Sequence, residues 1–352
     1  MRYGIVGAGM MGVEHIENIL ALDRCEVAAV SDPDEHSRQV GLDAAPGAVA
    51  YADHSDMLER SDLDVVVVAS PNHTHADVLG DLLGVDNLHL LVEKPLCTTV
   101  EDCDRVLDQA EGRSGLVWMG LEYRYMPPVA RLIDEVASGS AGNVKMVSIR
   151  EHRFPFLTKV GNWNRFSRNT GGTLVEKCCH FFDLMCLLVD ANPIRVMASG
   201  SQDVNHLDEI YDGDVPDIID NAFVIVDFDG GQRAMLDLCM FAEATRNQEE
   251  ISVAGDKAKL EALVPDDVVR IGRRGEHWIG SVEEHHISDK SIAHEGLHHG
   301  ASFVEHRKFA DCIRSGSAPE VSLADGRLSV AIGAAAHLSI DEGRIVDLGE
   351  IL

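Results

Sequence analysis

Basic residues are scarce in this chain of 352 residues, which has 30 Lys and Arg against 59 Asp and Glu. The formal charge of -29 would repel the phosphates of a nucleic acid, so the composition argues against nucleic-acid binding. Lysine is the rarer of the two cations, with 8 Lys against 22 Arg. An acidic, lysine-poor surface stays hydrated in concentrated salt, which makes a halophilic source a hypothesis from composition.

Membrane spans, secretion signals and zinc-ligand spacings are missing as well. No apolar run has the length that crosses a bilayer, and residues 1–10 enter a strand and a glycine loop without a signal-peptide pattern. The 8 cysteines form no C-x-x-C pair and mostly lie in apolar runs, which is typical of buried thiols in a reducing compartment. We therefore expect a cytoplasmic protein with no metal site and no membrane association.

A glycine loop follows the first apolar strand directly, and a helical pattern continues over residues 13–22. In such a unit the first glycine makes a tight turn, the second lets the backbone approach a pyrophosphate, and the third allows close helix packing. The phosphates then lie at the helix N-terminus. The loop residues expected to contact a dinucleotide are Gly7, Gly9, Met10, Met11 and Gly12.

A second predicted strand, residues 26–31, ends at Asp32, about 20 residues beyond the last glycine, as in dinucleotide-binding units. An acid here accepts hydrogen bonds from the adenine-ribose 2′-hydroxyl of NAD, whereas the 2′-phosphate of NADP would meet its negative charge. NAD is therefore the predicted cofactor, and NADP is the alternative.

Polar residues follow two further predicted strands, at 65–68 and 88–92. The four valines of the first strand are typical of a central parallel strand covered on both faces. Because ligands of open α/β sheets lie at the carboxyl ends of the strands, the residues after them are candidates for cofactor contacts. These residues are Ser70, Pro71, Asn72, His75, Glu93 and Lys94. Asn72 could equally cap a helix, and Lys94 is also placed to reach a substrate.

The stretch GGTLVEKCCHFFDL, residues 171–184, places three polar groups in an apolar segment. Glu176, His180 and Asp183 have the i, i+4, i+7 spacing, which stacks them on one face of a helix. A carboxylate beside an imidazole holds its tautomer and supports proton transfer near neutral pH. The alternative is a buried helix whose polar groups are simply satisfied.

These motifs resemble, in the same order, those of the Gfo/Idh/MocA family of oxidoreductases. The similarity covers nearly the whole chain: GAGMMG at 7–12, SPNHTH at 70–75, EKPL at 93–96, RYMP at 124–127, SGSAGNV at 138–144, residues 171–184, and SIDEGRIV at 339–346. The resemblance implies a Rossmann NAD(P)-binding domain, residues 1–122, followed by an α+β domain, residues 123–352. It also implies that one face of the second sheet mediates contacts in a homodimer or homotetramer.

The resemblance further implies that the lysine of EKP acts with an acid and a histidine four residues apart, here Lys94, Glu176 and His180. This chain departs from the commonest pattern in having Glu176 where Asp is frequent. Lys177 follows it, and either binds an additional group of the substrate or points away from the pocket.

Other candidates lie near the domain junction and before the glycine pair of residues 171 and 172. Arg124 either touches the cofactor or packs at the hinge. Trp163 and Arg165 offer a ring face and hydrogen-bond donors suited to a sugar, or they anchor a loop.

Beyond residue 122 the pattern indicates a largely antiparallel open sheet that helices cover on one face. Strands are expected at 144–150, 194–200, 221–228, 233–241, 250–253 and 268–271, with a hairpin turn at 229–231. Helices are expected at 127–138, 172–190, 301–315 and 323–341.

Residues 283–299 are rich in histidine and acid and contain His294-Glu295-Gly296-Leu297-His298, a literal H-E-x-x-H pattern. That zinc motif requires a helix, which Gly296 weakens, and no third ligand is evident. A loop beside the substrate pocket is the expected structure, with plain solvated surface as the alternative.

The predicted function is hydride transfer between the nicotinamide cofactor and a polyhydroxylated small molecule such as a sugar, sugar acid or inositol. His180 would take the hydroxyl proton, and Lys94 would stabilise the charge that develops on the oxygen. One alternative is a redox cycle on tightly bound NAD that serves a glycosidase or lyase reaction. The other is a non-catalytic sensor of dinucleotide or sugar.

Overall fold

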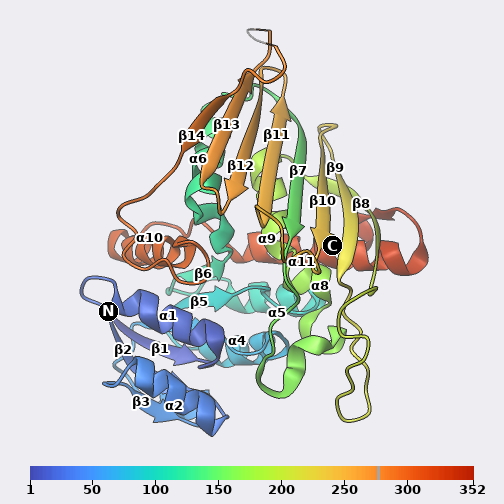
Figure 1. The fold of residues 1–352 in the computed structure, drawn as a ribbon. Coiled ribbons are helices and arrows are strands. Elements are labelled where there is room, and N and C mark those ends of the chain that lie inside the picture. The colour runs from blue at the N-terminus through green and yellow to red at the C-terminus, as the bar shows by residue number, and fades with distance from the viewer. Residues whose placement is uncertain (276–277) are drawn as a thin grey trace.

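The computed structural model describes residues 1–275 and 278–352, which fold around two β-sheets (Figure 1). The first sheet has six parallel strands in the order β3-β2-β1-β4-β5-β6. These strands are β1 (Arg2–Val6), β2 (Glu26–Ser31), β3 (Val49–Tyr51), β4 (Val65–Val68), β5 (His89–Glu93) and β6 (Val117–Gly120). The helices between them are α1 (Met10–Leu20), α2 (Glu35–Ala44), α3 (His54–Leu58), α4 (His75–Leu83) and α5 (Val100–Ala110).

The position of β4 in this sheet explains its sequence. All four valines are 0% exposed, because a strand covered by helices on both faces has no solvent side that would require alternation. The chain order reverses between β1 and β4, and ligands of doubly wound sheets bind at such a reversal. The glycine loop after β1 and Ser70 after β4 therefore meet at one edge of the sheet.

The second sheet has nine strands in the order β14-β13-β12-β11-β7-β10-β9-β8-β15. Neighbours are antiparallel, apart from the parallel pair of β7 and β10. The strands are β7 (Val144–His152), β8 (Pro193–Ser201), β9 (Asn221–Phe228), β10 (Arg233–Cys239), β11 (Glu249–Gly255), β12 (Ala258–Val264), β13 (Val268–Arg273), β14 (Glu283–His286) and β15 (Val346–Asp347). The architecture confirms the predicted fold class.

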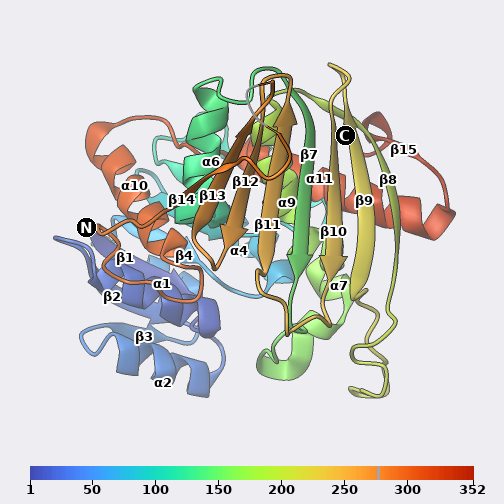
Figure 2. The same ribbon diagram turned by 45° about the horizontal axis from the view of Figure 1, so that its top comes forward.

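Helices cover one face of the second sheet and connect it to the first (Figure 2). The helices of this part are α6 (Pro127–Ala137), α7 (Ser167–Thr170), α8 (Thr173–Glu176), α9 (Cys179–Val189), α10 (Ala301–Ser315) and α11 (Leu323–Glu342). Helix α10 contacts α1, and α11 contacts both α5 and α9. Short 3-10 helices are η1 (Asn72–Thr74), η2 (Glu122–Tyr125), η3 (Val160–Arg165) and η4 (Leu348–Glu350). Within the described ranges, no helix combines the length and apolarity needed to cross a membrane.

The prediction of one continuous helix over residues 172–190 was wrong. The chain forms α8, a turn at Lys177 and Cys178, and then α9. The break coincides with a buried ion pair in which the ammonium of Lys177 lies 3.0 Å from Glu151 of β7, a partner that local periodicity does not reveal. The sequence analysis also missed β3, β6, β12, β14 and β15, of which β12 pairs with β11 and β13.

Candidate active site

The glycine loop has the tight geometry that its sequence predicts. Gly7 has a φ of +94°, and a Cβ there would lie 2.5 Å from the carbonyl oxygen of Ala69. A Cβ at Gly12 would lie 2.0 Å from the carbonyl oxygen of Gly7, so α1 packs directly on the turn. A Cβ at Gly9 would meet no protein atom within 4 Å. The space above Gly9, at the N-terminus of α1, is thus open to a ligand, and phosphate groups suit this position.

Backbone hydrogen bonds fix the carboxylate of Asp32 beside this loop. Its Oδ2 accepts from the N–H of Ala8 at 2.8 Å, and its Oδ1 accepts from the N–H of Asp34 at 2.9 Å. Arg38 folds back and donates to the carbonyl oxygens of Asp32 and Pro33, at 2.6 and 2.9 Å. The acid is therefore held where a ribose hydroxyl of a dinucleotide would lie.

One cavity of about 690 Å³ extends from the glycine loop of the first domain to residues 158–163 and Glu176 of the second. The predicted site residues that line it are Gly7, Gly9, Met10, Met11, Asp32, Ser70, Pro71, Asn72, Glu93, Lys94, Trp163 and Glu176. The Nδ2 of Asn72 and the Oε2 of Glu176 are buried and have no hydrogen-bond partner among the described protein groups. These orphaned polar atoms fit a ligand that hydrogen-bonds to both side chains.

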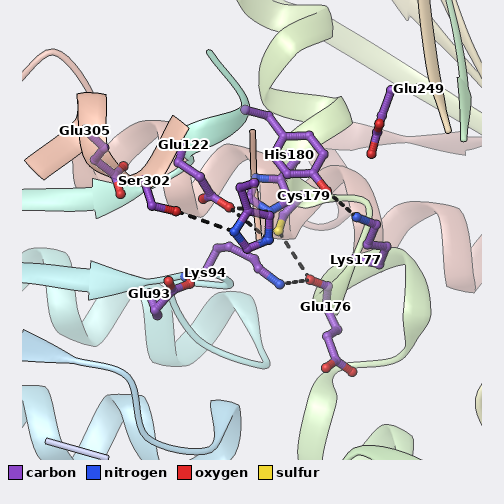
Figure 3. Close-up of polar contacts among 12 residues, drawn as sticks. Glu93, Lys94, Glu122, Glu176, Lys177, Cys179, His180, Glu249, Ser302 and Glu305 are labelled. Carbon is purple, nitrogen blue, oxygen red and sulfur yellow. Dashed lines mark hydrogen bonds and ion pairs between the residues drawn. The ribbon is translucent and has the colours of Figure 1, made fainter. Parts of the chain in front are cut away.

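Lys94 lies where the cavity meets the second domain, at the end of β5. Its ammonium donates to the carbonyl oxygen of Glu176 at 3.2 Å (Figure 3), and the Lys94–Pro95 peptide bond is cis. Burial pulls the pKa of Lys94 down, but neighbouring acidic groups, Cys179 first and then Glu93, outweigh it and raise this pKa above its ordinary value. Lys94 therefore stays an ammonium and a hydrogen-bond donor at neutral pH.

Glu176 lines the cavity beside Lys94 and is 5% exposed. Burial raises the pKa of Glu176 to about 7, although the charges of Lys94 and Lys159 lower it. The carboxyl group is therefore poised between its protonated and ionised forms near neutral pH.

His180 is buried in α9 and is not a cavity-lining residue. Its ring stacks on Tyr123, with 4.0 Å between centroids and 5° between planes. Its Nε2 is 3.7 Å from Oε1 of Glu122, and its Nδ1 has no hydrogen-bond partner among the described protein groups. Burial, followed by the charges of Lys94 and Lys177, holds the pKa of His180 well below its usual value. The imidazole is thus neutral in the resting protein.

Lys177 points away from the cavity. Its ammonium donates to the hydroxyl of Tyr123 at 2.5 Å and pairs with Glu151, and burial lowers its pKa. Of the two alternatives for Lys177, the structure has the one in which the side chain points away from the pocket, because its ammonium pairs with Glu151 inside the second domain.

Three further predicted site residues have internal partners instead of cavity contacts. The ring nitrogens of His75 lie 2.8 and 3.0 Å from the carbonyl oxygens of Pro95 and Ser70, so this ring links the loops after β4 and β5.

Arg124 forms a two-bond ion pair with Asp183, and Arg165 donates to Glu209 at 3.0 Å. Each guanidinium therefore has an acidic partner, and Asp183 has a supporting role.

The cavity also contains residues that the sequence analysis did not select. Lys159 and Thr158 line it from the segment before η3, and Asp53 and His54 line it beside Asp32. Burial lowers the pKa of Lys159. These residues belong to no recognisable motif, so only their proximity to Trp163 and to strand ends could have indicated them.

The H-E-x-x-H segment is not helical, as expected from Gly296. His294 approaches α1, where its Nε2 lies 3.4 Å from Glu17, whereas Nε2 of His298 lies 3.8 Å from Glu122. The two imidazoles therefore contact different parts of the protein, and they do not form the zinc-protease geometry. Within residues 1–275 and 278–352, the group of side chains close enough to hold a metal ion is Glu14, Glu17 and His294.

Two family models match the chain and together span both sheets. The model described as "Oxidoreductase family, NAD-binding Rossmann fold" matches residues 1–121. The model described as "Oxidoreductase family, C-terminal alpha/beta domain" matches residues 133–348. The chain belongs to the Gfo/Idh/MocA oxidoreductase family. Membership confirms the predicted NAD-dependent oxidoreductase class and the dinucleotide-binding role of the first domain.

Two named relatives and one solved structure are similar to this chain over nearly its full length. It is 27% identical to the myo-inositol 2-dehydrogenase of Thermotoga maritima over 100% of both chains. It is 24% identical to the scyllo-inositol 2-dehydrogenase (NAD(+)) of Bacillus subtilis, over 99% of this chain and 96% of that one. A levoglucosan dehydrogenase in complex with NADH and levoglucosan has the same fold, with a TM-score of 0.85, 18% identity and 99% coverage of both chains.

Proposed function

We propose that this Gfo/Idh/MocA protein oxidises a hydroxyl group of a cyclic polyol or sugar, of the inositol type, with NAD as the hydride acceptor. The observation that carries the proposal is that one cavity contains both the dinucleotide-binding residues and the pair of Lys94 and Glu176. The names of the full-length relatives support a polyol substrate. The ring of Trp163 in the cavity wall suits the apolar face of such a molecule.

Bound NAD would supply the hydride acceptor. The Lys94 ammonium hydrogen-bonds to the reacting oxygen and stabilises its developing negative charge. The carboxyl group of Glu176 binds a hydroxyl of the substrate from the same wall. His180 accepts the released proton on its orphaned Nδ1 through the Lys94 ammonium, which keeps its own charge. Catalytic contacts of this kind tighten when the substrate binds.

The proposal is tested by assaying the protein with NAD and myo-inositol, scyllo-inositol and levoglucosan, following nicotinamide absorbance. Lys94→Met and His180→Asn should each lower kcat by about 100-fold or more, because each removes an acid-base or electrostatic contribution. The dissociation constant for NADH should stay unchanged. Lys259→Met is the matched control, because that lysine is 56% exposed.

Near-normal turnover by either site variant would refute the mechanism. Cofactor binding without turnover of any polyol would favour a sensor. Accumulation of NADH during the assay would distinguish the proposed reaction from a redox cycle, because the cycle regenerates NAD at each turnover.

We also propose that the outer face of the second sheet joins copies of this chain. Met197, Ile225 and Met235 are register neighbours on β8, β9 and β10, and they are 45, 38 and 38% exposed. Phe223 on the same face is 63% exposed. An apolar row of this kind is typical of an association surface. Ile225→Lys should convert the assembly to monomers in light scattering, and an unchanged molar mass would contradict the proposal.

A further inference from the structure

Glu122 is a buried carboxylate that the reaction described so far does not use. It lies in η2, directly beyond β6, and it is 2% exposed. Neither of its oxygens has a hydrogen-bond partner among the described protein groups. Since buried polar side chains are satisfied in the large majority of cases, an orphan carboxylate next to an active site requires an explanation.

Two imidazoles face this carboxylate. One of them, His180, belongs to the proposed site and is labelled with Glu122 in Figure 3. Oε1 of Glu122 lies 3.7 Å from Nε2 of His180 and 3.8 Å from Nε2 of His298. Tyr123 holds the first ring by stacking, and Oγ of Ser302 lies 3.4 Å from Nδ1 of the second. The gaps to Glu122 exceed hydrogen-bond length, and a small side-chain shift or one bridging water closes them.

Exposure increases along this row of side chains. His180 and Glu122 have side chains that are 1 and 2% exposed, whereas the His298 side chain is 21% exposed. His298 is the last residue of the H-E-x-x-H segment, which runs from β14 to α10, and its ring is only partly buried. The row therefore leads from the proposed proton acceptor to solvent without passing through the cofactor cavity.

We propose that Glu122 and His298 form a proton path that connects His180 with solvent. The inference rests on the proposed function, because it assumes that His180 receives the proton of the substrate hydroxyl. The proton binds Nδ1 of His180, leaves from Nε2 to the Glu122 carboxylate, and passes to His298 and then to water. The electron pair of the broken C–H bond leaves as hydride to NAD, so charge and atoms balance. Both residues act through His180, and neither touches the substrate.

The charges around Glu122 favour the first transfer of this path, from His180 to Glu122. The groups that face it from the packed elements are Glu93 and Lys94 at the end of β5, Lys177 and His180 around the start of α9, and His298 and Glu305 before and within α10. Burial and the charge of Glu93 raise the pKa of Glu122 to about 8, against the lowering by Lys94. A proton on His180, whose own pKa is lowered, therefore moves readily to ionised Glu122.

His298 holds the proton only briefly, because burial lowers its pKa to about 3. Substrate oxidation requires Glu122 in its ionised form, so the oxidation rate should rise with pH through the range near pH 8.

The test follows single turnovers of the holoenzyme in a stopped-flow instrument, with NADH absorbance and a pH indicator recorded together. In the wild type, proton release should keep pace with NADH formation. In His298→Ala, proton release should lag by about tenfold, and added imidazole should restore it. Glu122→Gln should lower the oxidation rate by about tenfold or more and remove its rise near pH 8. NADH affinity should be unchanged in both variants.

The control is His286→Ala, because that histidine is 78% exposed on β14 and should behave as wild type. Wild-type proton release in His298→Ala, without any response to imidazole, would overturn the path even if Glu122→Gln failed to fold. Failure of the proposed function is a separate result, since it would appear as retained turnover in Lys94→Met or His180→Asn.

Discussion

Replacing Asp183 by asparagine removes the negative charge that faces Arg124 inside the protein while keeping the size of the side chain. The two side chains are only 3 and 10% exposed. The Nε of Arg124 donates to Oδ2 of Asp183 at 2.6 Å, and its Nη2 donates to Oδ1. The variant therefore leaves a buried guanidinium without its main counter-ion.

Breaking a buried ion pair from one side costs about 3–5 kcal/mol. Asp325 lies 3.5 Å from the same guanidinium with a side chain that is 38% exposed, and the carbonyl oxygen of Glu320 accepts a hydrogen bond at 3.2 Å. Because these groups compensate in part, we expect the lower end, about 3 kcal/mol. For a cooperatively unfolding unit of about 150–250 residues, that loss lowers Tm by roughly 6–12 °C.

Urea unfolding of the wild type, Asp183→Asn, Arg124→Met and the double variant Arg124→Met/Asp183→Leu measures this cost. The double variant should recover most of the stability, because it buries no unpaired charge. NADH affinity should be nearly equal in all four proteins. If Arg124→Met weakened NADH binding by tenfold at unchanged stability, Arg124 would be a cofactor ligand and the structural assignment would be refuted.

Three other predictions follow from the site. Gly9→Ala should fold normally but lose NADH affinity in calorimetry, because its Cβ would enter only the space that the ligand occupies. Gly12→Ala should instead lower Tm, because its Cβ would lie 2.0 Å from the carbonyl oxygen of Gly7. Equal effects of the two variants on NADH affinity and on Tm would contradict this. Asp32→Asn should raise kcat/KM for NADP relative to NAD by about tenfold, since it removes a charge facing the 2′-phosphate, and an unchanged ratio would argue against that contact. Folding raises the pKa of Glu122 from 4.5 to about 8, so its contribution to stability is present at low pH and is lost as pH rises toward 8. The Tm of Glu122→Gln relative to wild type should therefore increase between about pH 5 and 9. A Tm difference that stays constant over this range would contradict the pKa shift.

Much of the cofactor end of the site could be predicted from sequence because it depends on local geometry. A glycine loop between a strand and a helix, with an acid after the next strand, has one common structural use, and the structure places Gly9 and Asp32 in the same cavity. The strand-end position of Lys94 follows from the same logic. The substrate end was less predictable, because the helix expected over residues 172–190 is broken at Lys177, whose partner Glu151 lies on β7.

The sequence by itself determined strands β1, β2, β4 and β5 and the nucleotide loop of the first domain, and the identity of the main polar groups, because turn stereochemistry and hydrophobic periodicity act within short stretches of chain. Only the tertiary structure decided which polar groups face the cavity and which face each other. Arg124 meets Asp183, and Lys177 meets Glu151, since each buried charge requires a partner from a distant element. The same packing brings His298, from a motif that reads as a zinc site, next to Glu122 beside His180. Contacts between segments so far apart in sequence leave no periodic signal, so the fold alone reveals them.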